Sequence, residues 1–412
     1  MASFSDLPDT NAAVASALSR GPAAMPSPAL IEKIARCYIA VTVIAYLVDL
    51  LRQTRDGLTD GAGRPFGDDF INFWSGPFLA WHQRAAEIYN VDAFHAFEQS
   101  IVGVHLQAYN YSYPPVLLVL TAPLALIPYL PGLVLWLSAG WFAFYRSLRL
   151  AMPNGRALLF AFATPAVFIN AVAGQNGTWT AALFGAGLGL LDRWPIMAGG
   201  FLGLLAYKPQ LGILIPIALL AGRRWRALAA ASVTAGALVV ISLVWLGPDI
   251  YADYLQRLAL IRHFSLEDGT GVWHRSLSVF TAARRLGADV QIAYIAQALV
   301  GGVAALAVAA VWFRGATFRI RNATLILGTC LATPYLQDYD MAFGALVVAW
   351  LWQDEEVRQV AEFPLFLACA AVLLIPLFAA SLALATDLAW GPVFIAPLFV
   401  MTVKCGLAKR PA

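Results

Sequence analysis

The sequence contains few charged residues. Asp, Glu, Lys and Arg make up only 12% of its 412 residues, and 60% are hydrophobic. Soluble domains carry about 25% charged residues, so roughly half of the usual charge is missing. A water-facing surface cannot be covered with so little charge. The composition therefore excludes a soluble globular protein and predicts a polytopic integral membrane protein.

Cysteine is also scarce. Its four cysteines, Cys37, Cys330, Cys369 and Cys405, lie in or beside apolar segments and show no metal-ligand spacing. They are therefore expected to be small buried residues rather than a disulfide or zinc site. A net charge of +3 gives no electrostatic reason to bind nucleic acid. A cleavable signal peptide is not expected, because the polar first 28 residues lack a charged segment leading into a short apolar run.

Apolar segments of suitable length recur along most of the chain. A membrane-spanning helix needs about 20 mainly apolar residues. The candidates are residues 37–51, 115–127, 132–144, 157–172, 178–191, 196–220, 227–246, 292–313, 323–333, 341–352, 363–384 and 389–403. They predict an all-α integral membrane bundle of about twelve transmembrane helices, forming one domain over residues 34–405. Residues 1–33 are expected to be a disordered cytoplasmic tail, and residues 406–412 a second cytoplasmic tail.

Two polar segments, residues 52–113 and 247–289, are too long to be turns. The first is expected to form amphipathic surface helices around residues 78–81 and 94–104. Basic residues at 223–226, 314–321 and 404–410 predict the cytoplasmic side, so the N-terminus lies inside and both long loops lie outside.

Three arginines, Arg146, Arg149 and Arg156, do not fit this alternation. A broken or re-entrant segment around residues 127–131 would restore it, since such breaks are tolerated where protein or water covers them.

Polar side chains interrupt the apolar pattern at several places. Five of these contain the main candidate site residues: Asp68 and Asp69, Tyr113, Gln175 and Asn176, Lys208, and Asp340. Lys208 is the sharpest signal, because a lysine at the centre of a membrane helix costs about 2.5–3.5 kcal/mol. It suits a phosphate ligand, although a structural ion pair or a snorkelling side chain remains an alternative. Gln175 and Asn176 could instead satisfy backbone groups at a helix break, and Tyr113 could be architectural.

The second long loop adds cationic candidates: Arg262, His263, His274 and Arg275. They lie on the same predicted side of the membrane as Asp69. Together with Lys208 they could bind a lipid phosphate. A solvated loop carries similar residues, so each is weak alone.

The order of these motifs resembles glycosyltransferase family 87 over residues 66–343. The motifs are Asp-Phe-x-x-Phe-Trp from Asp69, Tyr-x-Tyr-Pro-Pro from Tyr111, Gly-Gln-Asn from Gly174, Lys208-Pro209 with Arg-Arg-Trp-Arg after it, and Pro-Tyr-x-x-x-Tyr-Asp ending at Asp340. This family comprises polyprenyl-phosphate-sugar-dependent transferases of the GT-C superfamily, including α-1,2-mannosyltransferases.

The resemblance implies a GT-C-like bundle with its active site at the outer membrane surface. The donor would be a sugar, mannose by guess, on a polyprenyl phosphate. The acceptor would be a glycan or glycolipid of the envelope. The protein would lie in a cell inner membrane, with its active site on the periplasmic side. An acidic residue of the first large loop would be the catalytic base, which by position is Asp69, with Asp68 as the adjacent candidate. Some members carry a late histidine, which is missing between Gln337 and Asp340, so that role is not assigned.

A single base without a second nucleophilic carboxylate fits one-step transfer with inversion. No cofactor beyond the donor is expected. Asp68 and Asp69 could bind a divalent metal, but the basic residues already supply charge, so we expect none. The absence of a Gly-rich phosphate loop agrees with a lipid-linked donor.

The main alternative is a transporter or flippase of lipid-linked sugars or other solutes. It predicts an internal repeat of spans and a polar path through the whole membrane. We find no convincing repeat, and the polar clusters gather on one predicted side. A non-catalytic scaffold would not explain Lys208 or the paired acids.

Overall fold

The computed structural model describes residues 25–152, 155–269 and 272–408, and this part of the chain folds into helices without strands. In the first half these are α2 (Pro28–Arg52), α3 (Phe70–Trp81), η1 (Ala85–Glu87), α4 (Val91–Val102), α5 (Val116–Thr121), η2 (Ala122–Leu126), α6 (Tyr129–Ala151), α7 (Ala157–Ala163), α8 (Pro165–Val172), α9 (Gly177–Leu190), α10 (Pro195–Leu204), η3 (Leu205–Tyr207), α11 (Pro209–Gly212) and α12 (Ile215–Ala221). The second half comprises α13 (Trp225–Leu246), α14 (Asp249–Ile261), η4 (Arg262–Glu267), η5 (Trp273–Arg275), α15 (Val279–Arg285), α16 (Val290–Phe313), α17 (Phe318–Ala332), η6 (Asp338–Phe343), α18 (Gly344–Trp352), α19 (Glu355–Thr386) and α20 (Gly391–Leu407). The predicted all-α class is confirmed.

Four helical segments of the described chain are long and apolar enough to cross a membrane: Pro28–Arg52, Trp225–Leu246, Val290–Phe313 and Glu362–Thr386. Other apolar helices are shorter, such as Pro195–Tyr207 and Pro209–Ala221. The structure is that of a membrane protein, whereas the count of about twelve spans stays a prediction.

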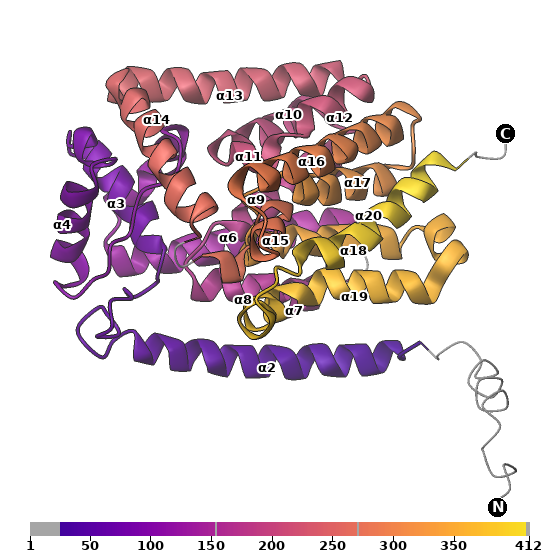
Figure 1. Ribbon diagram of the computed structural model, residues 1–412, viewed down its shortest axis with the longest axis horizontal. Helices are drawn as coiled ribbons and strands as arrows, with labels where there is room; N and C mark the ends of the chain where they lie inside the picture. Colours follow the sequence, from indigo (N-terminus) through magenta and orange to yellow (C-terminus); the bar gives the residue numbers. More distant parts are fainter. Residues whose placement is uncertain (1–24, 153–154, 270–271, 409–412) are drawn as a thin grey trace, which may run out of the picture.

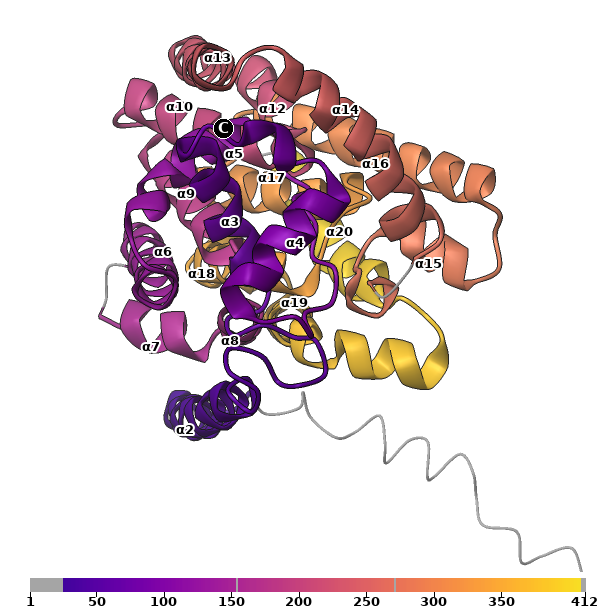
Figure 2. The ribbon, with the colours of Figure 1, turned by 90° about the vertical axis from the view of Figure 1, so that its left-hand side faces the viewer.

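The long helices run between two ends of the molecule. At the left in Figure 1, α3, α4 and α14 gather, and Figure 2 views this end directly. At the other end, Asp192 follows α9 and contacts Arg224 before α13 and Arg321 in α17. We call the first the loop end and the second the basic end. The basic segments of the sequence therefore do meet on one side.

One expected span, residues 196–220, is a hairpin rather than a single helix. The first arm, α10 with η3, starts at the basic end, because Asp192 precedes it. The second arm, α11 with α12, ends there, because Arg224 follows it. The tip carries Lys208, which has non-helical φ and ψ of −135° and 64°. The expectation that Lys208 lies at the centre of a membrane helix is therefore wrong. Pro209 explains the break, since proline cannot continue a helix and suits the first position of the next one.

Another expected span, residues 115–127, does not cross the molecule. At its end, the Ile127 carbonyl accepts a hydrogen bond from Trp74 Nε1 at 2.8 Å, and the hydroxyl of Tyr129 donates to the Phe66 carbonyl at 2.6 Å. Both partners belong to the first long loop, so α5 and η2 return to the loop end. This confirms the broken segment that the three unmatched arginines indicated.

Helix α6 then runs from the loop end to the basic end. Its last residue, Ala151, accepts a hydrogen bond from Gln353 Nε2 at 2.6 Å, and the adjacent Asp354 accepts one from Thr317 just before α17. Arg146 and Arg149 therefore lie towards the basic end, where the other basic segments meet.

Two expectations about surface segments are corrected. Helix α2 begins at Pro28, with Ser27 capping it by accepting from the Leu30 amide, so residues 28–33 are helical rather than disordered; the rest of the expected tail up to residue 24 lies outside the described residues. Helix α3, which contains residues 78–81, is buried over nearly its whole length and is not a surface helix. Its aromatic residues pack in the core of the loop end. Helix α4 is amphipathic as expected and buries Phe94 and Phe97.

The cysteines lie apart from one another and are free. Cys330 and Cys369 are buried, as expected, and Cys405 is half-buried. Cys37 is exposed on α2, which contradicts the expectation of burial. Its helix is a candidate membrane span that contacts α7 and α8 without burying any of its residues.

Candidate functional site

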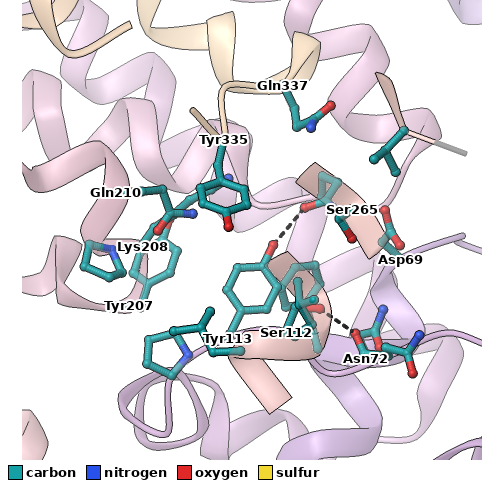
Figure 3. Close-up of a pocket in the computed structure, with 18 of the residues that line it drawn as sticks. Asp69, Asn72, Ser112, Tyr113, Tyr207, Lys208, Gln210, Ser265, Tyr335 and Gln337 are labelled. Atoms are coloured by element: carbon teal, nitrogen blue, oxygen red, sulfur yellow. Dashed lines mark hydrogen bonds between the residues drawn. The ribbon is translucent and has the colours of Figure 1, made fainter. Parts of the chain in front are cut away.

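A cavity of about 400 Å³ opens at the loop end. It brings together side chains from segments far apart in the sequence (Figure 3). Five of the predicted site residues line it: Asp69, Tyr113, Gln175, Lys208 and Arg275. In the view of Figure 3, Asp69 lies on one side of the cavity and Lys208 on the other.

Asp69 lies directly before α3 and reaches the cavity half-buried. Its Oδ2 accepts a hydrogen bond from Gln175 Nε2 at 2.7 Å. Among the described residues, its Oδ1 has no protein hydrogen-bond donor. One carboxylate oxygen is therefore held in place while the other can receive a proton.

The environment of Asp69 favours its protonated form more than water does. Burial raises the pKa of Asp69 from 3.8 to about 7, and the negative charge of Asp68 adds to the rise. The hydrogen bond from Gln175 and the positive charges of Arg275 and Arg64 act in the opposite direction. A carboxylate with a pKa close to neutral is suited to proton transfer near pH 7.

The Gly174-Gln175-Asn176-Gly177 segment needs both of its glycines for close backbone approach. A Cβ on Gly174, which has φ +58°, would collide with the Gly67 carbonyl and lie 2.8 Å from the amide nitrogen of Phe70. A Cβ on Gly177 would collide with the Tyr339 carbonyl. The two glycines thus let this turn fit between the Asp69 loop and η6, which places Gln175 against Asp69.

Asp68 has different surroundings from Asp69. Arg64 Nε donates to its Oδ2 at 2.9 Å, and the Tyr109 hydroxyl donates to its Oδ1 at 2.7 Å. Arg64 also binds Asp49 of α2 and the Val172 carbonyl. Asp68 does not line the cavity; it joins α2 to the loop end, so the geometry favours Asp69 as the base.

Lys208 is buried at the hairpin tip and forms an ion pair. Its Nζ lies 2.5 Å from Asp340 Oδ1 and 3.1 Å from Asn176 Oδ1. Asn176 and Asp340 do not line the cavity themselves, and they hold Lys208 from behind. The structural alternative for Lys208, an ion pair, is therefore realised, and the same residue also lines the cavity.

Arg275 reaches the cavity from η5. The neighbouring backbone pairs with the segment before η6, since the Leu277 amide donates to the Leu336 carbonyl at 2.9 Å. Arg275 Nε and Nη2 bind Asp338 at 3.0 and 2.9 Å. No hydrogen bond from its Nη1 to a described residue is present. Arg275 is therefore oriented by one carboxylate and retains donor capacity.

The ring of Tyr339 lies against both cations. Its centroid is 4.8 Å from Lys208 Nζ and 5.6 Å from Arg275 Cζ, within the range of cation–π attraction. The Asp338-Tyr339-Asp340 segment thus binds two cations with two carboxylates and one ring.

Three predicted site residues lie away from the cavity. Arg262 and His263 belong to η4, are exposed and contact Glu267. Ile261 at the end of α14 and Ser265 of η4 line the cavity instead. His274 is next to Arg275 but does not line the cavity, and burial lowers its pKa. None of these three side chains lines the cavity, whereas residues near each of them do, and their expected role beside the donor phosphate stays a prediction.

Several cavity residues were not predicted, among them Asn72, Tyr254 and Gln337. Asn72 follows Asp69 by three residues, which places it on the same face of a helix, and its buried Oδ1 has no partner among the described residues. That spacing was a usable signal. No sequence pattern indicates Tyr254 or Gln337 as site residues. An isolated tyrosine within a helix and a glutamine before a helix are both common.

The described residues contain no group of three or more His, Cys, Asp or Glu side chains placed to hold a metal ion. The expectation that no metal takes part stays a prediction.

The family model described as Glycosyltransferase family 87 matches residues 111–334, which is more than half of the chain. The matched region contains four of the five predicted residues that line the cavity and begins after Asp69. No curated protein and no solved structure matches the sequence.

Proposed function

The chain belongs to glycosyltransferase family 87, and from this membership we propose that it transfers a hexose, mannose by guess, from a polyprenyl-phosphate donor to a lipid or glycan acceptor of the envelope. It is a membrane glycosyltransferase. In our proposal the cavity at the loop end is the active site and faces the periplasmic side of a cell inner membrane.

One observation carries the proposal. A carboxylate that can accept a proton, Asp69, and two cations, Lys208 and Arg275, line the same cavity although they come from distant parts of the chain. Transfer from a phosphate-linked sugar needs a base for the acceptor and positive charge for the departing phosphate. The cavity supplies both, and in Figure 3 Asp69 and Lys208 lie on opposite sides of it.

The proposed reaction is a single displacement. Asp69 Oδ1 takes the proton of the acceptor hydroxyl as its oxygen bonds to the anomeric carbon of the sugar. The bond between that carbon and the phosphate oxygen breaks, and the phosphate leaves with the electron pair, so the anomeric configuration inverts. Arg275 Nη1 and Lys208 Nζ stabilise the charge on the leaving phosphate, and Gln175 holds Asp69 in position.

A transporter would need polar groups along the whole path between the two ends. In the described structure, the middle of the bundle is an extended apolar core that includes Phe184, Leu325 and Phe343. The family match and this core both favour the transferase.

The test is sugar transfer by the purified full-length protein. Labelled polyprenyl-phosphate mannose is incubated with an envelope lipid extract, and products are separated by chromatography. We expect label in a new lipid or glycan product. Binding of the donor without any product from several acceptor extracts, together with donor movement across proteoliposome membranes, would contradict the transferase and favour the transporter.

The pH dependence of transfer should follow Asp69. Because the base must be ionised, we expect kcat/KM to rise with pH and level off above about 7. Gln175→Leu removes a hydrogen bond to the ionised form, so it should raise the pKa of Asp69 and move this limb to higher pH. Asp68→Asn removes a neighbouring negative charge, so it should lower the pKa of Asp69 and move the limb to lower pH.

The two shifts in opposite directions are the diagnostic result, measured as pH profiles of kcat/KM in detergent. Asparagine is suited to position 68 because it tolerates the left-handed φ of +50° found there. An identical limb in all three proteins would mean that another group titrates.

A further inference from the structure

A second cavity, of about 310 Å³, lies at the basic end. It is formed where the α12–α13 and α16–α17 connections meet, and Arg223, Arg224 and Arg321 are in its lining. None of its residues lines the cavity at the loop end. It is therefore a separate site, and neither the family match nor the proposed transfer accounts for it.

The charge of this second cavity is not balanced within the described structure. Asp192 is the carboxylate that contacts the arginines: its oxygens lie 2.7 Å from Arg321 Nη2 and 2.7 Å from Arg224 Nη2. Arg223 has no ion pair with a described residue. Three guanidinium groups and one carboxylate leave a net charge of +2. Asp354, another acid of this end, accepts a hydrogen bond from Thr317.

Arg321 is buried and prepositioned. Its guanidinium carbon lies 5.3 Å from the centroid of the Trp312 ring, and Trp312 Nε1 donates to the Arg321 carbonyl at 2.9 Å. Its Nε is buried and has no hydrogen-bond partner among the described residues. A buried donor without a partner is costly, so a cavity lined by this side chain is suited to an acceptor brought by a ligand.

The position of the cavity indicates where that ligand comes from. Two candidate membrane spans terminate beside it: α13 begins at Trp225, and α16 ends at Phe313. These two aromatic side chains are 60% and 68% exposed. Tryptophan is enriched at the level of the lipid headgroups, so Trp225 indicates that level beside the cavity.

We propose that this cavity binds the phosphate group of an anionic lipid. Guanidinium groups bind phosphate oxygens through charge-assisted and often paired hydrogen bonds. Basic pockets between membrane helices on the cytoplasmic side bind anionic headgroups. Arg321, Arg224 and Arg223 supply the donors, and the exposed Trp225 and Phe313 lie where the acyl chains would pass. Free phosphate shares the headgroup chemistry but makes no use of this apolar rim.

Native mass spectrometry and thermal unfolding of the purified full-length protein test the proposal. Dioleoyl phosphatidic acid, dioleoyl phosphatidylcholine and inorganic phosphate are each titrated into the same detergent. We expect phosphatidic acid to be retained and to raise Tm, and phosphatidylcholine to do neither. Arg223→Gln should weaken retention of phosphatidic acid about tenfold, because one charged contact is lost.

Arg226→Gln is the matched control. Arg226 is exposed in the first turn of α13 and does not line the cavity, so Arg226→Gln removes the same amount of positive charge from this end as Arg223→Gln does. It should leave retention unchanged. Equal weakening by both variants, or no preference for phosphatidic acid over phosphatidylcholine, would overturn the proposal. An equal Tm increase with inorganic phosphate, lost in Arg223→Gln, would keep the phosphate site but assign it to a free anion.

Discussion

Asp69→Asn is expected to lower kcat for sugar transfer by about 10²–10⁴-fold, the usual contribution of a general base. Asparagine keeps the shape of the side chain, and its oxygen can still accept the hydrogen bond that Gln175 donates. It loses the negative charge and, with it, the ability to take a proton. Asp69 makes no helix-capping hydrogen bond with its side chain, so the unfolding temperature should stay near that of the wild type, as measured in the same detergent.

Asp92→Asn is a suitable control for this variant. Asp92 lies in the same long loop, on the exposed face of α4, and makes no ion pair with a described residue. It should retain full activity. An Asp69→Asn protein that is stable and transfers sugar at the wild-type rate would remove Asp69 as the base. Transfer lost together with a marked fall in unfolding temperature would make its role structural.

The sequence was most informative where polar residues conflict with a membrane environment. Asp69, Gln175 and Lys208 interrupt apolar segments, and such groups are retained in a membrane protein only where partners or water surround them. The structure brings all three to one cavity. The all-helical fold followed from the same reasoning, because hydrocarbon forces the backbone to satisfy its hydrogen bonds internally.

Long-range pairing could not be predicted. Lys208 and Asp340 form an ion pair although they are separated by 132 positions, and no local pattern indicates which acid meets which base. The same limit applies in the second long loop, where Arg275 lines the cavity and Arg262 does not. A loop segment with basic residues looks the same in sequence whether it faces solvent or a site.

Hydrophobic length also misled the prediction of the spans. Residues 196–220 are apolar enough for one membrane helix but form two arms around Pro209. Residues 115–127 are equally apolar but return to the loop end, where α3 and α13 pack against them. Apolar composition indicates that a segment is shielded from water. It does not show whether lipid or other parts of the protein surround that segment. The proline in the first segment was the available signal.

Lys208→Met is expected to destabilise the protein strongly, because it leaves the Asp340 carboxylate buried without its counter-charge. Breaking one partner of a buried ion pair costs about 3–5 kcal/mol, which should appear as a clear fall in unfolding temperature. Donor KM should also rise by about tenfold or more if Lys208 binds the phosphate, since a charged hydrogen bond is lost. The single variant cannot separate these two effects.

The double variant Lys208→Met/Asp340→Asn separates them. It removes both charges, and asparagine can still accept the hydrogen bond that the Gln337 amide donates to Asp340 at 3.2 Å. Most of the lost stability should return, because neither charge is then buried alone. Donor KM should stay raised, because the cavity still lacks the ammonium group. Lys33→Met, which removes an exposed lysine of α2 that does not line the cavity, should change neither quantity. A double variant that regains both stability and donor KM would show that Lys208 only supports η6, and the positive charge facing the leaving phosphate would then rest on Arg275.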